Sequence, residues 1–267
     1  MSDDSISLAR SSPAIAARLR ELTPARVGLG RTGVSQQTRD VLAFQLSHAQ
    51  ARDAVHARLE PAALAAAIGR IAQNSPDASV IRLRSAAPDR TTYLQRPDLG
   101  RTLDERARQA LAPFASGSFD LALVVADGLS ALAVERHAVS LLNELLPRLA
   151  DWKIAPVCVV EQGRVAIGDE IGSALNAALS VVFIGERPGL SSPDSLGAYI
   201  TWHPRPGRTD AERNCISNIR VEGLGYREAA AQILDCLTTA RLRQLTGTAL
   251  FPEPRRLPNA RDNGGGK

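Results

Sequence analysis

The sequence contains few lysine, cysteine and aromatic residues, and each scarcity argues against a class of protein. Lysine occurs only at positions 153 and 267, so no GxxxxGK(S/T) phosphate-binding loop exists and lysine Schiff-base chemistry is disfavoured. Three cysteines without a CxxC pair support neither a disulfide framework nor a structural zinc site, and they fit a reducing cytosol. Aromatic residues make up 4% of the chain, too few for the stacking platforms that bind single-stranded nucleic acids.

The chain also lacks a long apolar run. Its first residues, MSDDSISLARSSPAIAARLREL, begin acidic and hold no extended apolar core, so no secretory signal is expected. No stretch has the length of a membrane-spanning helix, and no membrane partner is expected. The formal net charge is +4, but the arginines are interleaved with acids and form no basic block, which argues against a nucleic-acid partner. HExxH is absent and the four histidines form no cluster, so no metal site is predicted.

Apolar residues nonetheless make up 44% of the 267 residues, which predicts a globular protein with a sizeable core of small and aliphatic side chains. We divide the chain into a flexible lead-in over 1–20, a smaller mixed and largely helical region over 21–113, an α/β domain over 114–250, and a Pro- and Gly-rich disordered tail over 251–267. Within the second part, the apolar spacing predicts helices at 36–59, 61–73 and 101–113, and strands at 79–85 and 90–96.

From residue 114 onward the pattern becomes regular. An apolar strand is expected to end at Asp127-Gly128, and further strands are expected over 154–160, 179–185 and 195–202. The predicted helices are one capped by Ser130, one over 169–178 and a last one over 227–244. Continuous apolar strands that alternate with helices are typical of a mainly parallel sheet covered on both faces. The expected fold class is therefore α/β, with a Rossmann-like C-terminal sheet preceded by the smaller helical region.

Three of the predicted strands are followed by glycine-containing loops, which we call exits. They lie at residues 127–130 (DGLS), 162–165 (QGRV) and 185–189 (GERPG). In open α/β sheets, ligands bind beyond the carboxyl ends of the strands. A ligand can approach glycine closely, although glycine also ends strands that bind nothing. In the third exit, Glu186 and Arg187 point to opposite faces of an extended chain, so one of them can face a crevice. Residues 187–190 suit a type II turn.

Other motifs allow weaker hypotheses. The string GLGRTG at 28–33 matches the GxGxxG pattern of dinucleotide-binding oxidoreductases, but the preceding ELTPAR is no buried strand, which favours a flexible arginine-bearing loop. His48 and Arg52 share one helix face, where a solvated or subunit-facing pair is expected. Cys215 and Cys236 are by default expected to be buried structural thiols. No catalytic triad or carboxylate dyad stands out, so a scaffold or regulatory module with an empty crevice stays open as well.

Several long strings, in the same order, make the chain resemble the light (small) chain of ethanolamine ammonia-lyase. They are ARVGLGRTG followed by Thr38, YLQRPDLGR, the DGLS exit, QGRVAIGDEIG, IGERPGL with its continuation SSPDSLGAY, and CISNI. The resemblance covers most of the chain, and this set of strings is far more specific than GxGxxG.

The resemblance implies a lyase subunit that is active only with a heavy chain. In that family the heavy chain is a barrel that binds ethanolamine and carries the radical chemistry, which yields acetaldehyde and ammonia. Adenosylcobalamin lies between the chains, and the light chain forms a floor and clamp for the corrin, so no catalytic residue is expected in this chain. The resemblance also implies a hetero-oligomer of several heavy–light pairs that serves ethanolamine catabolism.

Three positions at which the family's light chain contacts cobalamin match Val165, Glu186 and Cys215 in this chain. Val165 offers apolar and backbone contact, the Glu186 carboxylate can accept from the amides that fringe a corrin, and Cys215 is a small neighbour or backbone donor. The chain has no DxHxxG motif, so the resemblance implies a coenzyme that keeps its own base on cobalt. Few residues precede the matched strings, fewer than in members packed into bacterial microcompartments, so the cytoplasm is the expected location.

Overall fold

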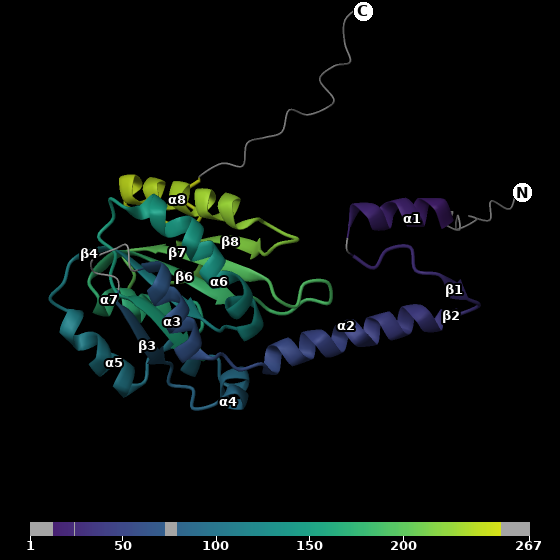
Figure 1. Cartoon of the computed structure of the whole chain (residues 1–267), viewed down its shortest axis with the longest axis horizontal. Helices are drawn as coiled ribbons and strands as arrows, with labels where there is room; N and C mark the ends of the chain where they lie inside the picture. The colour runs from purple at the N-terminus through teal and green to yellow at the C-terminus, as the bar shows by residue number, and fades with distance from the viewer. Residues whose placement is uncertain (1–12, 24, 73–78, 252–267) are drawn as a thin grey trace, which may run out of the picture.

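The computed structural model describes residues 13–23, 25–72 and 79–251 (Figure 1). The expected flexible lead-in and disordered tail fall largely on residues 1–12 and 252–267, which lie outside the described residues. The helices are α1 (Pro13–Leu22), α2 (Thr38–His56), α3 (Pro61–Ala72), α4 (Arg90–Gln95), α5 (Glu105–Leu111), α6 (Ala131–Leu145), α7 (Ile167–Ala174) and α8 (Tyr226–Arg243). The strands are β1 (Arg31–Thr32), β2 (Ser35–Gln36), β3 (Val80–Arg84), β4 (Phe119–Ala126), β5 (Val157–Glu161), β6 (Ala177–Gly185), β7 (Leu196–Trp202) and β8 (Arg213–Ile219).

One six-stranded sheet organises the body of the molecule, in the order β3-β5-β4-β6-β7-β8. The first four of these strands are parallel, and β7 and β8 extend the sheet with antiparallel pairing. The predicted α/β class with a mainly parallel C-terminal sheet is therefore confirmed. Strand β3 comes from the 21–113 region and pairs with β5, so that region contributes an edge of the sheet. The division of the chain into four parts stays a prediction.

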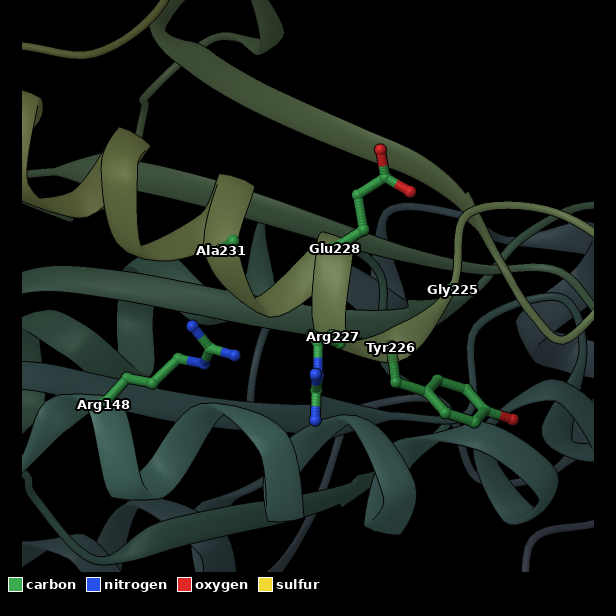
Figure 2. Close-up of a pocket in the computed structure, with 6 residues that line it drawn as sticks. All are labelled: Arg148, Gly225, Tyr226, Arg227, Glu228 and Ala231. Atoms are coloured by element: carbon green, nitrogen blue, oxygen red, sulfur yellow. The ribbon is translucent and has the colours of Figure 1, made fainter.

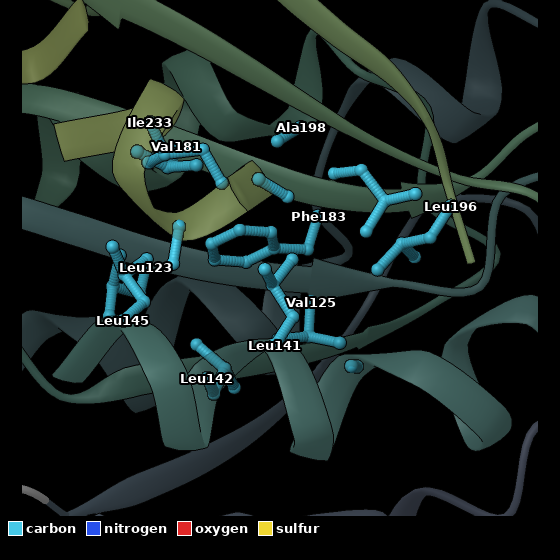
Figure 3. Packing of buried hydrophobic residues seen from close by; sticks show 14 of the residues in the cluster. Leu123, Val125, Leu141, Leu142, Leu145, Val181, Phe183, Leu196, Ala198 and Ile233 are labelled. Atoms are coloured by element: carbon cyan, nitrogen blue, oxygen red, sulfur yellow. The ribbon is translucent and has the colours of Figure 1, made fainter. Parts of the chain in front are cut away.

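Alternate residues of β4 belong to two cores, one on each face of the sheet. Leu121, Leu123 and Val125 pack with α3, α6 and α8, whereas Ala122 and Val124 pack with α5 and α7. Because side chains alternate along a strand, a strand covered on both faces must be apolar throughout, as the sequence of β4 is. Figure 3 shows the core on the α6 and α8 side, where the Phe183 ring lies among leucine and valine side chains.

The helix that follows β4 begins where the sequence predicts it. The Ser130 hydroxyl accepts a hydrogen bond from the backbone N–H of Ala133, which caps α6. The helices predicted at 36–59, 61–73 and 227–244 are likewise present as α2, α3 and α8 within a few residues at each end.

The strand predicted at 90–96 is wrong, because these residues form helix α4. The Asp89 carboxylate accepts hydrogen bonds from both the backbone N–H and the hydroxyl of Thr92, which caps the helix. This local cap outweighs the β-propensity of two threonines and a tyrosine.

Two other helices differ from the expected ranges. The helix predicted at 101–113 narrows to α5, because Asp104 caps it and Thr102 before it is extended. The helix predicted over 169–178 begins earlier and ends at Ala174, because Asn176 adopts a φ of 49° and leads into β6. Positive φ does not continue a right-handed helix.

Residues 28–33 do not form a dinucleotide-binding loop. In the described chain, helix α1 precedes them rather than a parallel strand, and they lead into the antiparallel pair β1 and β2. Gly28 has a φ of 60°, and a Cβ there would lie 2.5 Å from the Cβ of Ala16. Gly33, with a φ of 64°, begins the two-residue loop of the hairpin. These glycines turn the chain and allow close packing.

Candidate functional site

The carboxyl ends of β4, β5 and β6 meet around one cavity of about 410 Å³. The parallel order β5-β4-β6 places these three ends side by side at one edge of the sheet. The three exits that the sequence singles out therefore line one crevice. The lining residues are Tyr93, Gly128, Leu129, Arg164, Val165, Ile184, Gly185, Glu186, Arg187 and Tyr199.

Glu186 lines this cavity, and its carboxylate is held in one orientation. The backbone N–H of Glu186 donates to the carbonyl of Ser195 at 2.9 Å. The carboxylate accepts hydrogen bonds from the Ser195 hydroxyl and, at 3.3 Å, from the backbone N–H of Asn218. These donors come from the start of β7 and the end of β8, so the antiparallel strands preset the carboxylate. Arg187 is exposed and also lines the cavity.

The type II turn predicted over 187–190 is wrong. Such a turn requires positive φ at its third residue, and Gly189 does not have it. The backbone N–H of Gly189 instead donates to the carbonyl of Ser192 at 3.0 Å, which closes a wider loop beside the cavity.

The loop that carries Val165 is held by α4 and the segment after it. The Tyr93 hydroxyl donates to the carbonyl of Gly163 at 3.0 Å, and the backbone N–H of Arg164 donates to the carbonyl of Gly100 at 2.7 Å. The Arg164 guanidinium carbon lies 4.2 Å from the centre of the Tyr93 ring. Burial raises the pKa of Tyr93, so its hydroxyl remains a neutral donor. Val165 is thereby fixed, half-buried, in the cavity wall.

Asp127 and Arg90 form a buried pair that links the exits. Oδ1 of Asp127 accepts from the backbone N–H of Gly163 at 3.0 Å, and Oδ2 lies 3.7 Å from Nη1 of Arg90. The same guanidinium donates to the carbonyl of Gly128 at 2.8 Å and to that of Val55, at the end of α2, at 2.7 Å. Burial raises the pKa of Asp127 to about 6, although Arg90 and backbone N–H donors act to lower it.

This shift predicts a pH dependence of stability that Asp127→Asn removes. A carboxyl whose pKa is higher in the folded chain than in the unfolded chain binds more protons when folded, so its contribution to stability falls as pH rises from about 4 to about 6. The free energy of unfolding of Asp127→Asn, relative to that of the wild type, should therefore rise across this window. Urea unfolding of both chains at several pH values measures the difference between their free energies of unfolding. The contributions of the other carboxyl groups are the same in both chains and cancel. A constant difference would contradict the raised pKa.

Cys215 lies beside the cavity without lining it. It is exposed in β8, where it pairs with Tyr199 of β7, so both side chains project from the same face of the sheet. Tyr199 lines the cavity, and burial together with Cys215 and Glu186 raises the pKa of its hydroxyl, which stays neutral. The default expectation of a buried Cys215 is wrong, because the buried apolar cluster on the α7 side of the sheet includes no residue of β8 among the described residues. Cys236 is buried as expected.

Several residues that shape the site were not among those predicted from the sequence. Tyr93 and Arg164 support the Val165 loop, Tyr199 connects Cys215 to the cavity, and Ser195 orients Glu186. All four belong to strings that carried the family resemblance, which was the available signal. Arg90 lay outside those strings, and nothing in the sequence pointed to its pairing with Asp127.

A second hollow, of about 600 Å³, lies between the first turns of α8 and the 3₁₀ turn Leu146–Leu149 that follows α6 (Figure 2). Arg148, Gly225, Tyr226, Arg227, Glu228 and Ala231 line it. It contains none of the site residues singled out from the sequence and lies beside α8, away from the strand exits. His48 and Arg52 are exposed on α2, away from both hollows.

The described residues contain no cluster of three or more His, Cys, Asp or Glu side chains suited to a metal ion. Over the same residues, no helix has the length and apolar character to cross a membrane. The fold and the cavity together define an α/β ligand-binding protein, whose crevice is built by three strand exits and holds preset polar side chains.

Comparisons with known proteins specify the family. A family model for the ethanolamine ammonia-lyase light chain matches residues 14–251. The chain is 56% identical over 240 residues to the ethanolamine ammonia-lyase small subunit of Pseudomonas aeruginosa (strain LESB58), covering 88% of this chain and 86% of the relative. It is 55% identical over 237 residues to that of Ralstonia nicotianae, covering 87% and 86%. The chain belongs to the ethanolamine ammonia-lyase light chain family. Members are subunits of an adenosylcobalamin-dependent carbon–nitrogen lyase and work with a heavy chain, so the resemblance is confirmed.

Proposed function

We propose that this chain forms one wall of the adenosylcobalamin site of an ethanolamine ammonia-lyase, and that a heavy chain supplies the opposite wall and the ethanolamine site. The observation that carries the proposal is the oriented Glu186 carboxylate in a crevice that three strand exits build together. The free, exposed Cys215 thiol supports a reducing compartment, and we place the protein in the cytoplasm.

The residues around the crevice fit one edge of a corrin. A corrin is a broad ring with apolar faces and a fringe of amide side chains, which both donate and accept hydrogen bonds. Leu129, Val165 and Ile184 supply an apolar wall, Glu186 supplies an acceptor, and the exposed Arg187 supplies donors. The cavity is much smaller than a whole cobalamin, so this chain contacts part of the coenzyme and leaves the rest to the heavy chain.

The part that this chain plays is to bind and orient. The bound coenzyme supplies the radical chemistry, and the protein supplies its position and its shielding from water. Val165 provides apolar and backbone contact, and Glu186 accepts from an amide group at the ring edge. Cys215, on the open flank of β8, is a small neighbour that lets the ring approach the sheet. The hydroxyls of Tyr93 and Tyr199 remain protonated at neutral pH, so they serve as fixed dipoles.

Glu186→Gln is expected to weaken coenzyme binding about tenfold in the heavy–light complex, the scale of one lost charge-assisted hydrogen bond. Glutamine keeps the size of the side chain and an oxygen for Ser195 and Asn218, so the fold should not change. Spectroscopic titration of the complex with adenosylcobalamin measures the affinity, and thermal unfolding checks the fold.

The matched control is Glu228→Gln, which removes an exposed carboxylate of α8 and should leave the affinity unchanged. Equal affinities of the wild type and Glu186→Gln would remove the role proposed for this carboxylate. Turnover of ethanolamine by the light chain alone would contradict the division of labour between the chains. Saturable NAD(P)H binding by the light chain alone would favour the nucleotide-dependent alternative instead.

A further inference from the structure

The N-terminal arm, which we define as residues 13–23 and 25–58, extends away from the body of the molecule (Figure 1). Only Ala54, near its end, is buried among the 19 residues of α2. The arm nevertheless has internal structure: Arg20 of α1 donates to the carbonyls of Val27 and Gly28, and Arg26 stacks on the Phe44 ring of α2 at 5.9 Å. α1, the hairpin and α2 therefore form a small unit joined to the body at one end.

Two apolar rows on the arm have no cover in the described chain. Ile15, Leu19 and Leu22 follow the i, i+4, i+7 spacing of a single face of α1, and all three are exposed. On α2, Leu42 and Leu46 share a face and are 59% and 61% exposed. A ten-residue helix is marginal in water, because most helical stability in proteins comes from burying an apolar face. These rows therefore have the character of a surface that a partner covers.

The charge of the arm narrows the choice of partner. Its net charge of +4 equals that of the whole chain, so the remaining residues sum to zero. Arg20, Arg26 and Arg39 also line a hollow of about 370 Å³ beside the start of α2. Two arms of this kind would repel each other, whereas a partner with acidic groups around an apolar surface would be attracted. The arm carries Arg18, Arg20, Arg26, Arg31, Arg39, Arg52 and Arg58 against Glu21, Asp40 and Asp53.

The end of the arm at which α2 joins the body of the molecule lies next to the coenzyme crevice. Arg90 donates to the carbonyl of Val55, at the end of α2, and to that of Gly128, in the crevice wall. A heavy chain that closes the crevice from the open side must approach this same edge of the sheet. α2 then extends about 28 Å from that edge, at 1.5 Å per residue, and α1 folds back along it.

We propose that the N-terminal arm is a docking surface for the heavy chain, with the rows on α1 and α2 seated on an apolar surface that acidic residues surround. The arm binds the heavy chain outside the coenzyme site, so association of the two subunits does not depend on the coenzyme. This inference rests on the proposed function, because it takes the heavy chain as the partner.

The test is the double variant Leu42→Gln/Leu46→Gln in the full-length chain. Glutamine favours helix almost as much as leucine, so α2 should persist while its apolar row is lost. The dissociation constant for the heavy chain, measured by analytical ultracentrifugation without coenzyme, should rise at least tenfold. The control Val221→Gln/Leu242→Gln removes two apolar side chains that are 71% and 84% exposed outside the arm, and it should bind like the wild type.

Three results would overturn the proposal. Equal affinities for the arm variant and the wild type would exclude the arm as the docking surface while leaving the coenzyme role intact. Altered self-association of the free light chain, with unaltered affinity for the heavy chain, would make a second copy of this chain the partner. A wild-type light chain that does not bind the heavy chain at all would overturn the proposed function as well. Circular dichroism of the free variant establishes that its helix content is retained.

Discussion

Gly185→Ala is expected to lower the free energy of unfolding by about 3 kcal/mol or more, the upper part of the range for overpacked sites. A Cβ at Gly185 would lie 2.0 Å from the carbonyl oxygen of Ser130 and 2.6 Å from that of Asp127. Both are backbone atoms of the 127–130 exit between β4 and α6, so no side-chain rotation relieves the clash. The first and third exits must move apart, which breaks the hydrogen bond of 2.9 Å from the Leu129 N–H to the Gly185 carbonyl.

The same change should damage the crevice, because Gly128 and Gly185 face each other in its wall. A Cβ at Gly128 would lie 2.3 Å from the carbonyl oxygen of Gly185, so neither position has room for a side chain. We therefore expect the complex of the heavy chain with Gly185→Ala to bind adenosylcobalamin more weakly than the wild-type complex does. Urea unfolding of the free chain and coenzyme titration of the complex measure the two effects separately.

Gly189→Ala is the matched control in the same loop. A Cβ there meets the Ser192 hydroxyl at 3.4 Å, an ordinary contact, and Gly189 does not have positive φ. Its stability should stay within about 0.5 kcal/mol of the wild type. If Gly185→Ala unfolds at the same urea concentration as Gly189→Ala, the close approach of the two exits does not govern the stability of the crevice.

The exits themselves could be predicted from the sequence because their signals are local. A continuous apolar run followed by Asp127-Gly128 and the cap Ser130 specifies a strand, a turn and a helix start within a dozen residues. Prediction from local sequence signals fails where a polar contact competes with the secondary-structure propensity of the segment. The Asp89 cap turns a segment with the composition of a strand into α4, and that helix then supports the Val165 loop.

The orientation of the site residues could not be predicted, because it depends on contacts between distant segments. The Glu186 carboxylate is held by Asn218, which is 32 residues further along the chain and joins it only through the antiparallel edge of the sheet. Cys215 is exposed because the apolar side chains of α7 pack on β4 and β6, whereas α7 contacts β8 through Arg213. Resemblance supplied the positions Val165, Glu186 and Cys215, and their contact with cobalamin stays a prediction that the crevice geometry supports.

Arg213→Ala is expected to cost about 3–5 kcal/mol of the free energy of unfolding, the range for removing one partner of a buried ion pair. Arg213 of β8 donates to both carboxylate oxygens of Asp169 in α7, at 2.6 and 2.7 Å, and both side chains are 2% exposed. It also donates to the Thr201 hydroxyl and to the Arg208 carbonyl. Although burial favours loss of its charge, the hydrogen bonds that Arg213 donates to Asp169 raise the pKa of Arg213 above its usual value.

This pair fastens β8 to α7, the helix that follows the Val165 loop, so it sets the position of Cys215 relative to the cavity. Burial raises the pKa of Asp169, and Arg213 lowers it through its hydrogen bonds and its charge. In Arg213→Ala, burial therefore remains the largest effect on this pKa, beside the smaller and opposed effects of the Arg208 and Glu212 charges. The folded variant then binds a proton that the unfolded chain releases, and its stability should fall further as pH rises above about 4.

The double variant Arg213→Met/Asp169→Leu separates pairing from packing. It removes both charges and keeps apolar bulk between β8 and α7, so it should recover most of the stability that Arg213→Ala loses. Urea unfolding at pH 5 and pH 7 should show a larger loss for Arg213→Ala at the higher pH and no such change for the double variant. If the double variant is as unstable as Arg213→Ala, the unpaired Asp169 carboxylate is not the cause of the lost stability. The hydrogen-bonded geometry of the charged pair would then be what holds β8 against α7. Titration of the double variant and the heavy chain with adenosylcobalamin then measures whether coenzyme affinity depends on the ion pair. In this variant the fold should be retained, while Cys215 is no longer positioned by the pair.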